Sequence, residues 1–258
     1  MAGDEVLISR DGPVLTLTFN RPEARNALTW AMYQRLDETC ETVDADDSIR
    51  VLVLRGAGGT FAAGTDIGQF TGFRTAEDGI AYERELERHL SRLERVRRPV
   101  IAQIQGAAAG AGFIIAAACD LRLATPDARF GAPIARTLGN CLSVEACARL
   151  VDLLGATRVK EVVFTARLLT AEEARAAGFV HEIVPPGEID ERVRALAAEI
   201  ADHAPITLWA AKEAIRRVQA ERRPRGGEDL IATTYASADF REGVRAFLEK
   251  RRPHWTGR

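Results

Sequence analysis

The stretches that decide the fold of this 258-residue chain are Phe61-Ala-Ala-Gly-Thr-Asp-Ile67 and Gly106-Ala-Ala-Ala-Gly-Ala-Gly-Phe113. Each follows an apolar run that predicts a buried strand, 51–54 before the first and 100–104 before the second. The second stretch leads into a helix-forming segment ending at Cys119, which places unpaired N–H groups and the positive end of a helix dipole at its glycines. One N–H donor from each stretch can therefore converge on a single oxygen as an oxyanion hole, which stabilises charge developing on a carbonyl.

Two other interpretations of these glycines need weighing. Tight strand–helix turns, in which glycine relieves crowding, explain either stretch alone equally well. A nucleotide-binding loop does not fit, because Gly106, Gly110 and Gly112 do not have G-x-G-x-x-G spacing and no Gly-Lys-Ser/Thr follows.

Taken together, the two stretches resemble the crotonase family, the enoyl-CoA hydratase/isomerase superfamily. Further resemblance lies in 20–28 (Asn-Arg-Pro-Glu-Ala-Arg-Asn-Ala-Leu), in Cys119-Asp120, in 168–180 and in 247–253, so it covers nearly the whole chain. It implies an α/β fold, a spiral of ββα units, with a core and acyl-CoA site over 1–200 and a helical trimerisation region over 201–258. The expected partner is an acyl-CoA thioester, with coenzyme A as part of the substrate and no separate cofactor or metal.

The resemblance also implies positions for the site. The oxyanion donors are expected to be the backbone N–H groups of Ala63 and Ala111. Phe247 and Lys250 match residues that reach the adenine end of coenzyme A, and Arg25 matches a phosphate contact. The full set of substrate-binding positions is Arg25, Ala27, Leu28, Ala63, Gly64, Thr65, Asp66, Ile67, Gly110, Ala111, Ile114, Ile134, Asn140, Phe247 and Lys250.

The chain departs from the family pattern where hydration needs an acid and a base. Hydratases of this family use two glutamates, and their positions are matched here by Ile114 and Ile134; a shift of one residue offers only Ala135. Asp66 and Glu145 are the candidate replacements. Each also has a structural interpretation, Asp66 as the cap of the following turn and Glu145 as a first-turn acid of a helix.

Two functions therefore remain open. The first is an acyl-CoA enzyme that stabilises a thioester enolate, with hydration, isomerisation, decarboxylation or hydrolysis as its reaction. The second is a non-catalytic acyl-CoA-binding or assembly subunit. Turnover of a thioester would distinguish them.

The amino-acid composition limits the class of protein to which the chain can belong. Apolar residues make up 47%, charged residues 28% and the net charge is −2, an ordinary globular balance that argues against nucleic-acid or membrane binding. The N-terminus lacks a signal-peptide pattern, and no apolar run approaches the roughly 20 residues of a membrane span, so a cytoplasmic location is expected. The cysteines lack C-x-x-C spacing and are expected to be reduced structural thiols.

Helical periodicity adds three expectations. Thr29 caps a helix that carries Met32, Leu36 and Val43 on one face. A highly charged helix follows over 76–97 with Leu86, Leu90 and Leu93 on one face, and the charges on its other face are expected to be solvated. The last helix carries an apolar stripe of Phe240, Val244, Phe247 and Leu248, which is expected to contribute to a trimer or a dimer of trimers.

Overall fold

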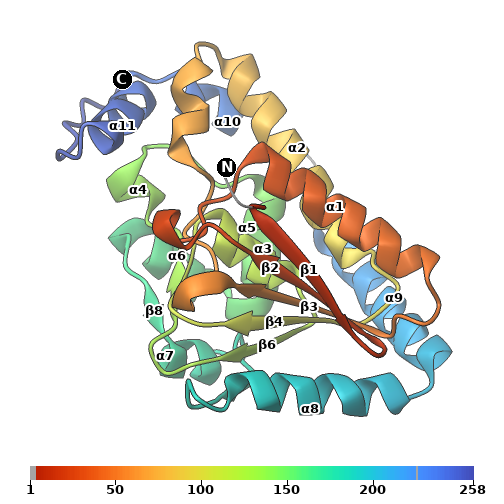
Figure 1. The fold of residues 1–258 in the computed structure, drawn as a ribbon. Helices are drawn as coiled ribbons and strands as arrows, with labels where there is room; N and C mark the ends of the chain where they lie inside the picture. Colours follow the sequence, from red (N-terminus) through yellow and green to blue (C-terminus); the bar gives the residue numbers. More distant parts are fainter. Residues whose placement is uncertain (1–3, 225) are drawn as a thin grey trace.

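A six-stranded sheet in the order β1-β2-β3-β4-β6-β9 forms the centre of the molecule (Figure 1). The computed structural model describes residues 4–224 and 226–258, so the N-terminal residues 1–3 that enter the signal-peptide argument lie outside it. The hairpin β1–β2 is antiparallel, and every later neighbour in this sheet is parallel. The strands are β1 (Val6–Asp11), β2 (Val14–Phe19), β3 (Val51–Gly56), β4 (Val100–Ile104), β6 (Leu121–Ala124) and β9 (Glu182–Ile183).

A smaller sheet of β5 (Ala107–Ala109), β7 (Arg129–Gly131) and β8 (Leu169–Thr170) lies beside the first. It begins where the second glycine-rich stretch leaves β4. A parallel bridge between Ala62 and Ala108 ties the first stretch to this sheet. The two sheets and their helices confirm the expected α/β class.

Helices cover both faces of the large sheet because its strands alternate their side chains. In β3, Leu52 and Leu54 join the core formed with α1 (Trp30–Ala45), α2 (Ala76–Glu94), α3 (Ala111–Ala118) and α5 (Val144–Leu154). Val51 and Val53 face the other way, onto α8 (Ile189–Asp202). As predicted, Thr29 caps α1 by accepting a hydrogen bond from the Met32 N–H at 3.3 Å.

The remaining elements connect and cover this core. They are the 3₁₀ helices η1 (Pro22–Ala24), η2 (Ala57–Gly59) and η3 (Ile67–Gly72), and the helices α4 (Ile134–Thr137), α6 (Ala156–Thr165), α7 (Ala171–Ala176), α9 (Pro205–Arg222), α10 (Glu228–Tyr235) and α11 (Ala238–Leu248). α10 packs on α2, and α11 packs on η3, so both cover the first 200 residues of their own chain. α9 contributes no buried residue. The predicted domain boundary at 200/201 falls in the last turn of α8 and stays a prediction.

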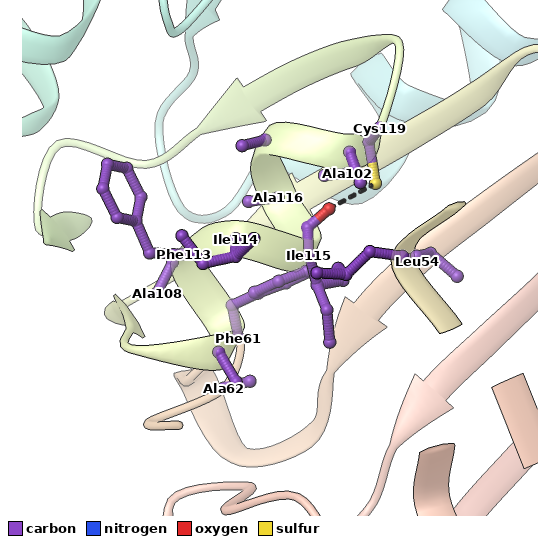
Figure 2. Packing of buried hydrophobic residues seen from close by; sticks show 14 of the residues in the cluster. Leu54, Phe61, Ala62, Ala102, Ala108, Phe113, Ile114, Ile115, Ala116 and Cys119 are labelled. Carbon is purple, nitrogen blue, oxygen red and sulfur yellow. Dashed lines mark hydrogen bonds between the residues drawn. The ribbon is translucent and has the colours of Figure 1, made fainter. Parts of the chain in front are cut away.

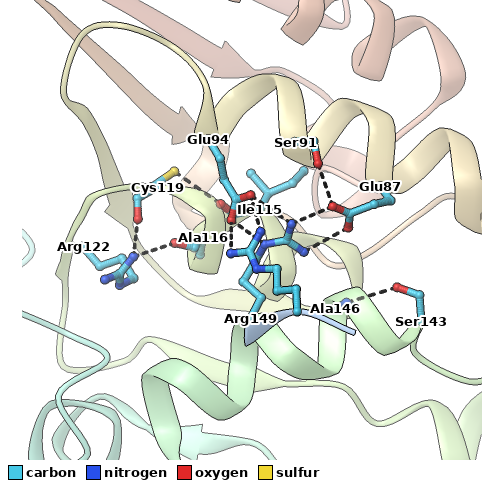
Figure 3. A network of polar contacts seen from close by, with 11 residues as sticks. Glu87, Ser91, Glu94, Ile115, Ala116, Cys119, Arg122, Ser143, Ala146 and Arg149 are labelled. Carbon is cyan, nitrogen blue, oxygen red and sulfur yellow. Dashed lines mark hydrogen bonds and ion pairs between the residues drawn. The ribbon is translucent and has the colours of Figure 1, made fainter. Parts of the chain in front are cut away.

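On the side of α2 that faces the core, charged side chains form a partly buried ion-pair network that the sequence pattern did not predict (Figure 3). Arg149 of α5 is only 2% exposed and pairs with Glu87 at 2.9 Å and Glu94 at 2.7 Å. Arg223, just after α9, also pairs with Glu94 at 2.6 Å. Burial alone would raise the pKa of Glu94, but the hydrogen bonds from Arg223 and Arg149 outweigh it and lower this pKa to about 2. This network joins α2, α5 and the end of α9.

The apolar stripe on the last helix is divided in the structure. Phe240 and Val244 are 2% and 8% exposed because they pack into their own chain. Phe247 and Leu248 at the end of α11 are each 49% exposed. Only this second half of the stripe is therefore available to a partner.

Candidate active site

The two glycine-rich stretches meet beside the start of α3, where Figure 2 shows Phe61 and Ala62 next to the helix. Ala62 donates its N–H to the Ala107 oxygen at 3.0 Å, and its own oxygen accepts from the Ala109 N–H at 2.9 Å. A Cβ on Gly112 would lie 2.2 Å from the Ala62 oxygen, and one on Gly110 would lie 3.6 Å from the Gly64 Cα. Glycine is therefore required at position 112 by the close approach of two backbones, whereas at position 110 it is favoured by a φ of 52°.

The backbone N–H groups at this junction can bind a substrate oxygen only if no other atom of the chain already accepts them. The Ala63 N–H donates to the Arg25 oxygen at 3.1 Å, so the prediction that Ala63 supplies a free donor is wrong. The N–H groups of Thr65 and Ala111 have no hydrogen-bond acceptor among residues 4–224 and 226–258. Ala111 is the first residue of α3, where helix geometry leaves the N–H unpaired. A Cβ on Gly64, the neighbour of Thr65, would lie 3.9 Å from the Ala111 nitrogen.

The backbone oxygen of Arg25 accepts the Ala63 N–H, and the loop that carries Arg25 is held in place by hydrogen bonds. Arg25 and Asn26 both have left-handed backbone, with φ of 51° and 55°. The fully buried Asn26 side chain accepts from the Arg21 N–H at 2.8 Å and donates to the oxygens of Ala57 and Thr60. The Arg25 side chain itself is exposed. A fixed loop thus presents a solvated guanidinium at the position expected to bind phosphate.

Leu28 and Thr65 form the next contact along the first stretch. The Leu28 N–H donates to the Gly64 oxygen at 2.8 Å, and the Asp66 N–H donates to the Leu28 oxygen at 2.9 Å. The Leu28 side chain is fully buried, so this residue acts through its backbone. Ala27 is half-buried, and its oxygen accepts from Arg21 at 2.6 Å.

The structural interpretations of Asp66 and Glu145 are confirmed. Asp66 accepts from the Gly68 N–H at 3.0 Å as the N-cap of η3, which begins at Ile67, and pairs with Arg21 at 2.9 Å. Glu145 lies in the first turn of α5. Both carboxylates thus stabilise the start of a helix, which explains their presence without a role in catalysis.

The two isoleucines differ in their surroundings. Ile114 is 1% exposed within α3, and Ile134 is half-buried at the start of α4. Asn140 donates to the Tyr235 hydroxyl at 3.2 Å, and its own side-chain oxygen is buried without a partner among the residues that the structure describes. Phe247 and Lys250 are exposed at the end of α11, and their contact with coenzyme A stays a prediction.

Sequence analysis missed Glu83. Its side chain is 5% exposed and accepts from the Tyr235 hydroxyl at 2.6 Å. It lines a cavity of about 170 Å³ between α2, α5 and α10, with Ser143, Glu145 and Ile231 among the other lining residues. Burial raises the pKa of Glu83 to about 7, with a further contribution from the charges of Glu145 and Glu87.

A sequence signal for Glu83 existed in the pattern of α2. Residue 83 falls on the same helical face as Leu86, Leu90 and Leu93, the buried residues that position α2 on the core. A glutamate in an apolar stripe predicts a buried acid. Its partner Tyr235 is 152 residues away, which the local pattern does not reveal.

No group of three His, Cys, Asp or Glu side chains within 4–224 and 226–258 is placed to hold a metal ion. Over the same ranges, no helix is both long and apolar enough to cross a membrane. The thiol of Cys141 is partly buried, which raises its pKa to about 11 and leaves it protonated near neutral pH.

Comparisons with known proteins agree on one family. The family model described as enoyl-CoA hydratase/isomerase matches residues 9–258. The 2,3-dehydroadipyl-CoA hydratase of Escherichia coli K12 is 36% identical, with 98% of this chain and 99% of that protein covered. An enoyl-CoA hydratase/carnithine racemase structure from Magnetospirillum magneticum is 33% identical, with a TM-score of 0.81 over 100% of this chain and 97% of the other. A methylmalonyl-CoA decarboxylase in complex with 2-nitronate-propionyl-CoA is 26% identical, with a TM-score of 0.89 and full coverage of both chains.

Proposed function

Since the chain belongs to the enoyl-CoA hydratase/isomerase family, we propose that it is an enzyme that stabilises a thioester enolate between the N–H groups of Thr65 and Ala111. The observation that carries this proposal is that these two amides lack acceptors within the described chain at the point where the two glycine-rich stretches touch. Donors already fixed in place stabilise a developing oxyanion without reorganisation, and loss of one costs about 3–4 kcal/mol of barrier lowering.

The proposal does not extend to hydration by two glutamates. An aliphatic side chain cannot transfer a proton, and Ile114 and Ile134 occupy the positions where the resemblance places the acid and the base. The reaction is instead one that an oxyanion hole supports with a different proton carrier, such as isomerisation, in which one group moves a proton between two carbons, or decarboxylation, after which water can protonate the enolate. The methylmalonyl-CoA decarboxylase among the structural neighbours makes decarboxylation a reaction to assay first.

A panel of acyl-CoA thioesters, followed by the change in mass of each, tests the proposal. Binding is measured in parallel by calorimetry at two salt concentrations, since contacts between Arg25 and phosphate weaken as salt screens them. Turnover of one thioester supports the enzyme. Binding without turnover of any thioester supports the alternative, a non-catalytic acyl-CoA-binding subunit, and absence of binding at millimolar ligand overturns both.

Substitution of Ala111 tests the donor itself. Proline is tolerated at the first position of a helix and removes the N–H, whereas glycine at the same position keeps it. We expect Ala111→Pro to lower kcat about 100- to 1,000-fold with little change in thermal stability, and Ala111→Gly to stay close to the wild type. Equal turnover by the two variants would show that this N–H does not contact the reacting oxygen.

A further inference from the structure

A cavity of about 540 Å³ lies at the end of α3 that is opposite to the candidate oxyanion donors. Ala117 and Ala118, the last residues of α3, line this cavity, whereas Ala111 is the first residue of the helix. At about 1.5 Å per residue, the helix separates the Ala111 N–H from the cavity by about 10 Å. The remaining walls come mainly from α5, β6, α8 and α9. The cavity is therefore separate from the candidate active site, and its volume is in the range of roughly 300–1,000 Å³ that small-molecule sites have.

The lining of this cavity combines an apolar surface with an excess of positive charge. The apolar part includes the aliphatic side chains of Leu121, Leu153, Ile200, Leu208 and Ile215. Among the described residues, the cations that line the cavity are Arg122, Arg149, Lys212, Arg216 and Arg223, against the carboxylates Glu94 and Asp120. Such a lining fits a ligand that has an apolar body and a negatively charged group.

Arg122 is the lining cation that forms no ion pair within the part of the chain that the structure describes (Figure 3). It is 3% exposed, and its guanidinium donates to four backbone oxygens, those of Phe179, Ala116, Cys119 and Asp120. A guanidinium has five N–H groups, so one N–H of Nη2 is left without an acceptor among these residues. Burial lowers the pKa of Arg122, because its charge is removed from water. A bound anion would accept this N–H and stabilise the buried charge.

Two further donors on the cavity wall are incompletely used. The ammonium group of Lys212 has three N–H groups, and two of them bond to the Asp120 carboxylate at 2.7 Å and the Arg98 oxygen at 3.0 Å. The Nε of Arg223 is buried without a partner in the described ranges, while its two Nη atoms bond to Glu94. Because the wall has donors to spare, the occupant of the cavity should supply an acceptor.

The charge balance favours one negative charge on that occupant. The other four cations of the lining are matched by four carboxylates, Lys212 by Asp120, Arg216 by Glu213, and Arg149 and Arg223 by Glu87 and Glu94. His181 also lines the cavity, and partial burial lowers its pKa, so it is mostly neutral near pH 7. The charge of Arg122 remains, and a carboxylate would neutralise it.

A structural role for Arg122 accounts for only part of these contacts. Its bonds to Ala116 and Cys119 place a cation at the C-terminal end of α3, where the helix dipole favours positive charge. That role uses neither the spare N–H of Nη2 nor the cavity beside it. Lys212 lies close to Arg122, because both side chains contact Asp120. A single carboxylate can therefore accept hydrogen bonds from both cations.

We propose that this cavity, the α3–α9 cavity, binds a small aliphatic carboxylic acid. The carboxylate accepts hydrogen bonds from Arg122 and Lys212, and the aliphatic chain packs on the apolar part of the lining. The cavity is then a second ligand site of the chain, one helix length away from the candidate oxyanion donors. It does not depend on the reaction that is carried out there.

Calorimetry with matched probes tests the proposal on the unmodified protein. Hexanoate and 1-hexanol have chains of the same length and differ in the charged group, and inorganic phosphate has charge without a chain. We expect one hexanoate per chain, bound at least about tenfold more tightly than either 1-hexanol or phosphate, since charged hydrogen bonds are roughly twice as strong as neutral ones. The same affinity for hexanoate should be measured in the presence of acetyl-CoA.

Equal binding of hexanoate and 1-hexanol would overturn the proposal, and so would displacement of hexanoate by acetyl-CoA. Absence of binding at millimolar hexanoate would also overturn it, as when a second copy of the chain fills the cavity. A protein that binds hexanoate but no acyl-CoA thioester would instead contradict the proposed function and leave this site in place.

Variants of α9 then assign the binding to the cavity. Lys212→Gln removes a donor cation and should weaken hexanoate binding about tenfold or more, whereas Lys212→Arg keeps the charge and should retain most of the affinity. Arg217→Gln is the matched control, because it makes the same change of charge on α9 at a side chain that is 73% exposed. Gln219→Glu adds a negative charge to the lining without breaking an ion pair, so it tests the site even if Lys212→Gln fails to fold. Equal hexanoate affinities of Gln219→Glu and Arg217→Gln would contradict the proposal.

Discussion

A buried carboxyl is the residue-level feature with the clearest consequence for stability. The pKa of Glu83 rises from its ordinary 4.5 to about 7, first because it is buried and further because Glu145 and Glu87 are near. The folded chain therefore holds a proton that the unfolded chain has released between these two pH values. The stability from this group is complete below pH 4.5 and is lost as the pH rises to about 7.

Glu83→Gln removes this titration and keeps an acceptor for Tyr235. One pKa unit corresponds to about 1.4 kcal/mol, so the variant should gain about 2–3 kcal/mol over the wild type between pH 5 and pH 8. Urea unfolding at the two pH values measures this. Parallel pH profiles for the two proteins would show that Glu83 ionises freely in the fold.

Ile114 and Ile134 leave the chain without an acid or a base at the two positions that hydration requires. General acid–base catalysis contributes about a hundred- to ten-thousand-fold per group, so crotonyl-CoA should be hydrated very slowly by the wild type. Loss of enoyl absorbance measures the rate. Turnover of about 10²–10³ per second, as in a fast enzyme, would show that another residue such as Asp66 or Glu145 transfers the proton. Ile114→Glu with Ile134→Glu is a secondary test, because an acid at the buried position 114 destabilises the fold.

At the scale of elements, the site depends on how closely α3 approaches the first glycine-rich stretch. A Cβ on Gly112 would lie 2.2 Å from the Ala62 oxygen. Because this oxygen belongs to the backbone, no change of side-chain rotamer can relieve the clash. Gly112→Ala should therefore displace the start of α3, lower stability by about 1–3 kcal/mol and reduce turnover more than tenfold. Thermal melts and the thioester assay measure both effects.

Gly187→Ala is the matched control, because no atom of the described part of the chain lies within 4 Å of a Cβ at that position. Its melting temperature and turnover should stay near the wild type. If Gly112→Ala behaves like this control, the two stretches do not need to touch for the site to work.

Local pattern predicted the elements well, and the errors arose where distant segments meet. Continuous apolar runs identified β3 and β4, which are buried on both faces, and helical spacing identified α1, which buries one face on the core. Which amide at the first stretch is free depends on the left-handed turn at Arg25 and Asn26, and one sequence does not show that the Arg25 oxygen reaches Ala63. The pairings of Glu83 with Tyr235 and of the Thr65 hydroxyl with those of Tyr33 and Tyr82 likewise form only when α1, α2 and α10 pack together.

For the whole molecule, the exposed helix α9 predicts self-association. No residue of α9 is buried in the single chain, and Ile206, Ile215 and Val218 are 76%, 60% and 53% exposed. Phe247 and Leu248 on α11 are also exposed, each at 49%. Large apolar side chains exposed on a helix are available to contact a partner. We therefore expect a trimer or a dimer of trimers, now with α9 as its main contact in place of the Phe240 and Val244 half of the stripe.

Light scattering at micromolar concentration tests this expectation, and a monomeric mass for the wild type would contradict it. Ile215→Asp with Val218→Asp puts two charges at neighbouring positions of the exposed face and should dissociate the assembly into smaller species. Since both side chains are exposed in the single chain, the subunits should keep their helical circular dichroism. Phe247→Ser with Leu248→Ser makes the same change on α11. If the substitutions on α11 dissociate the assembly more than those on α9 do, the main subunit contact is formed by the end of α11 and not by α9.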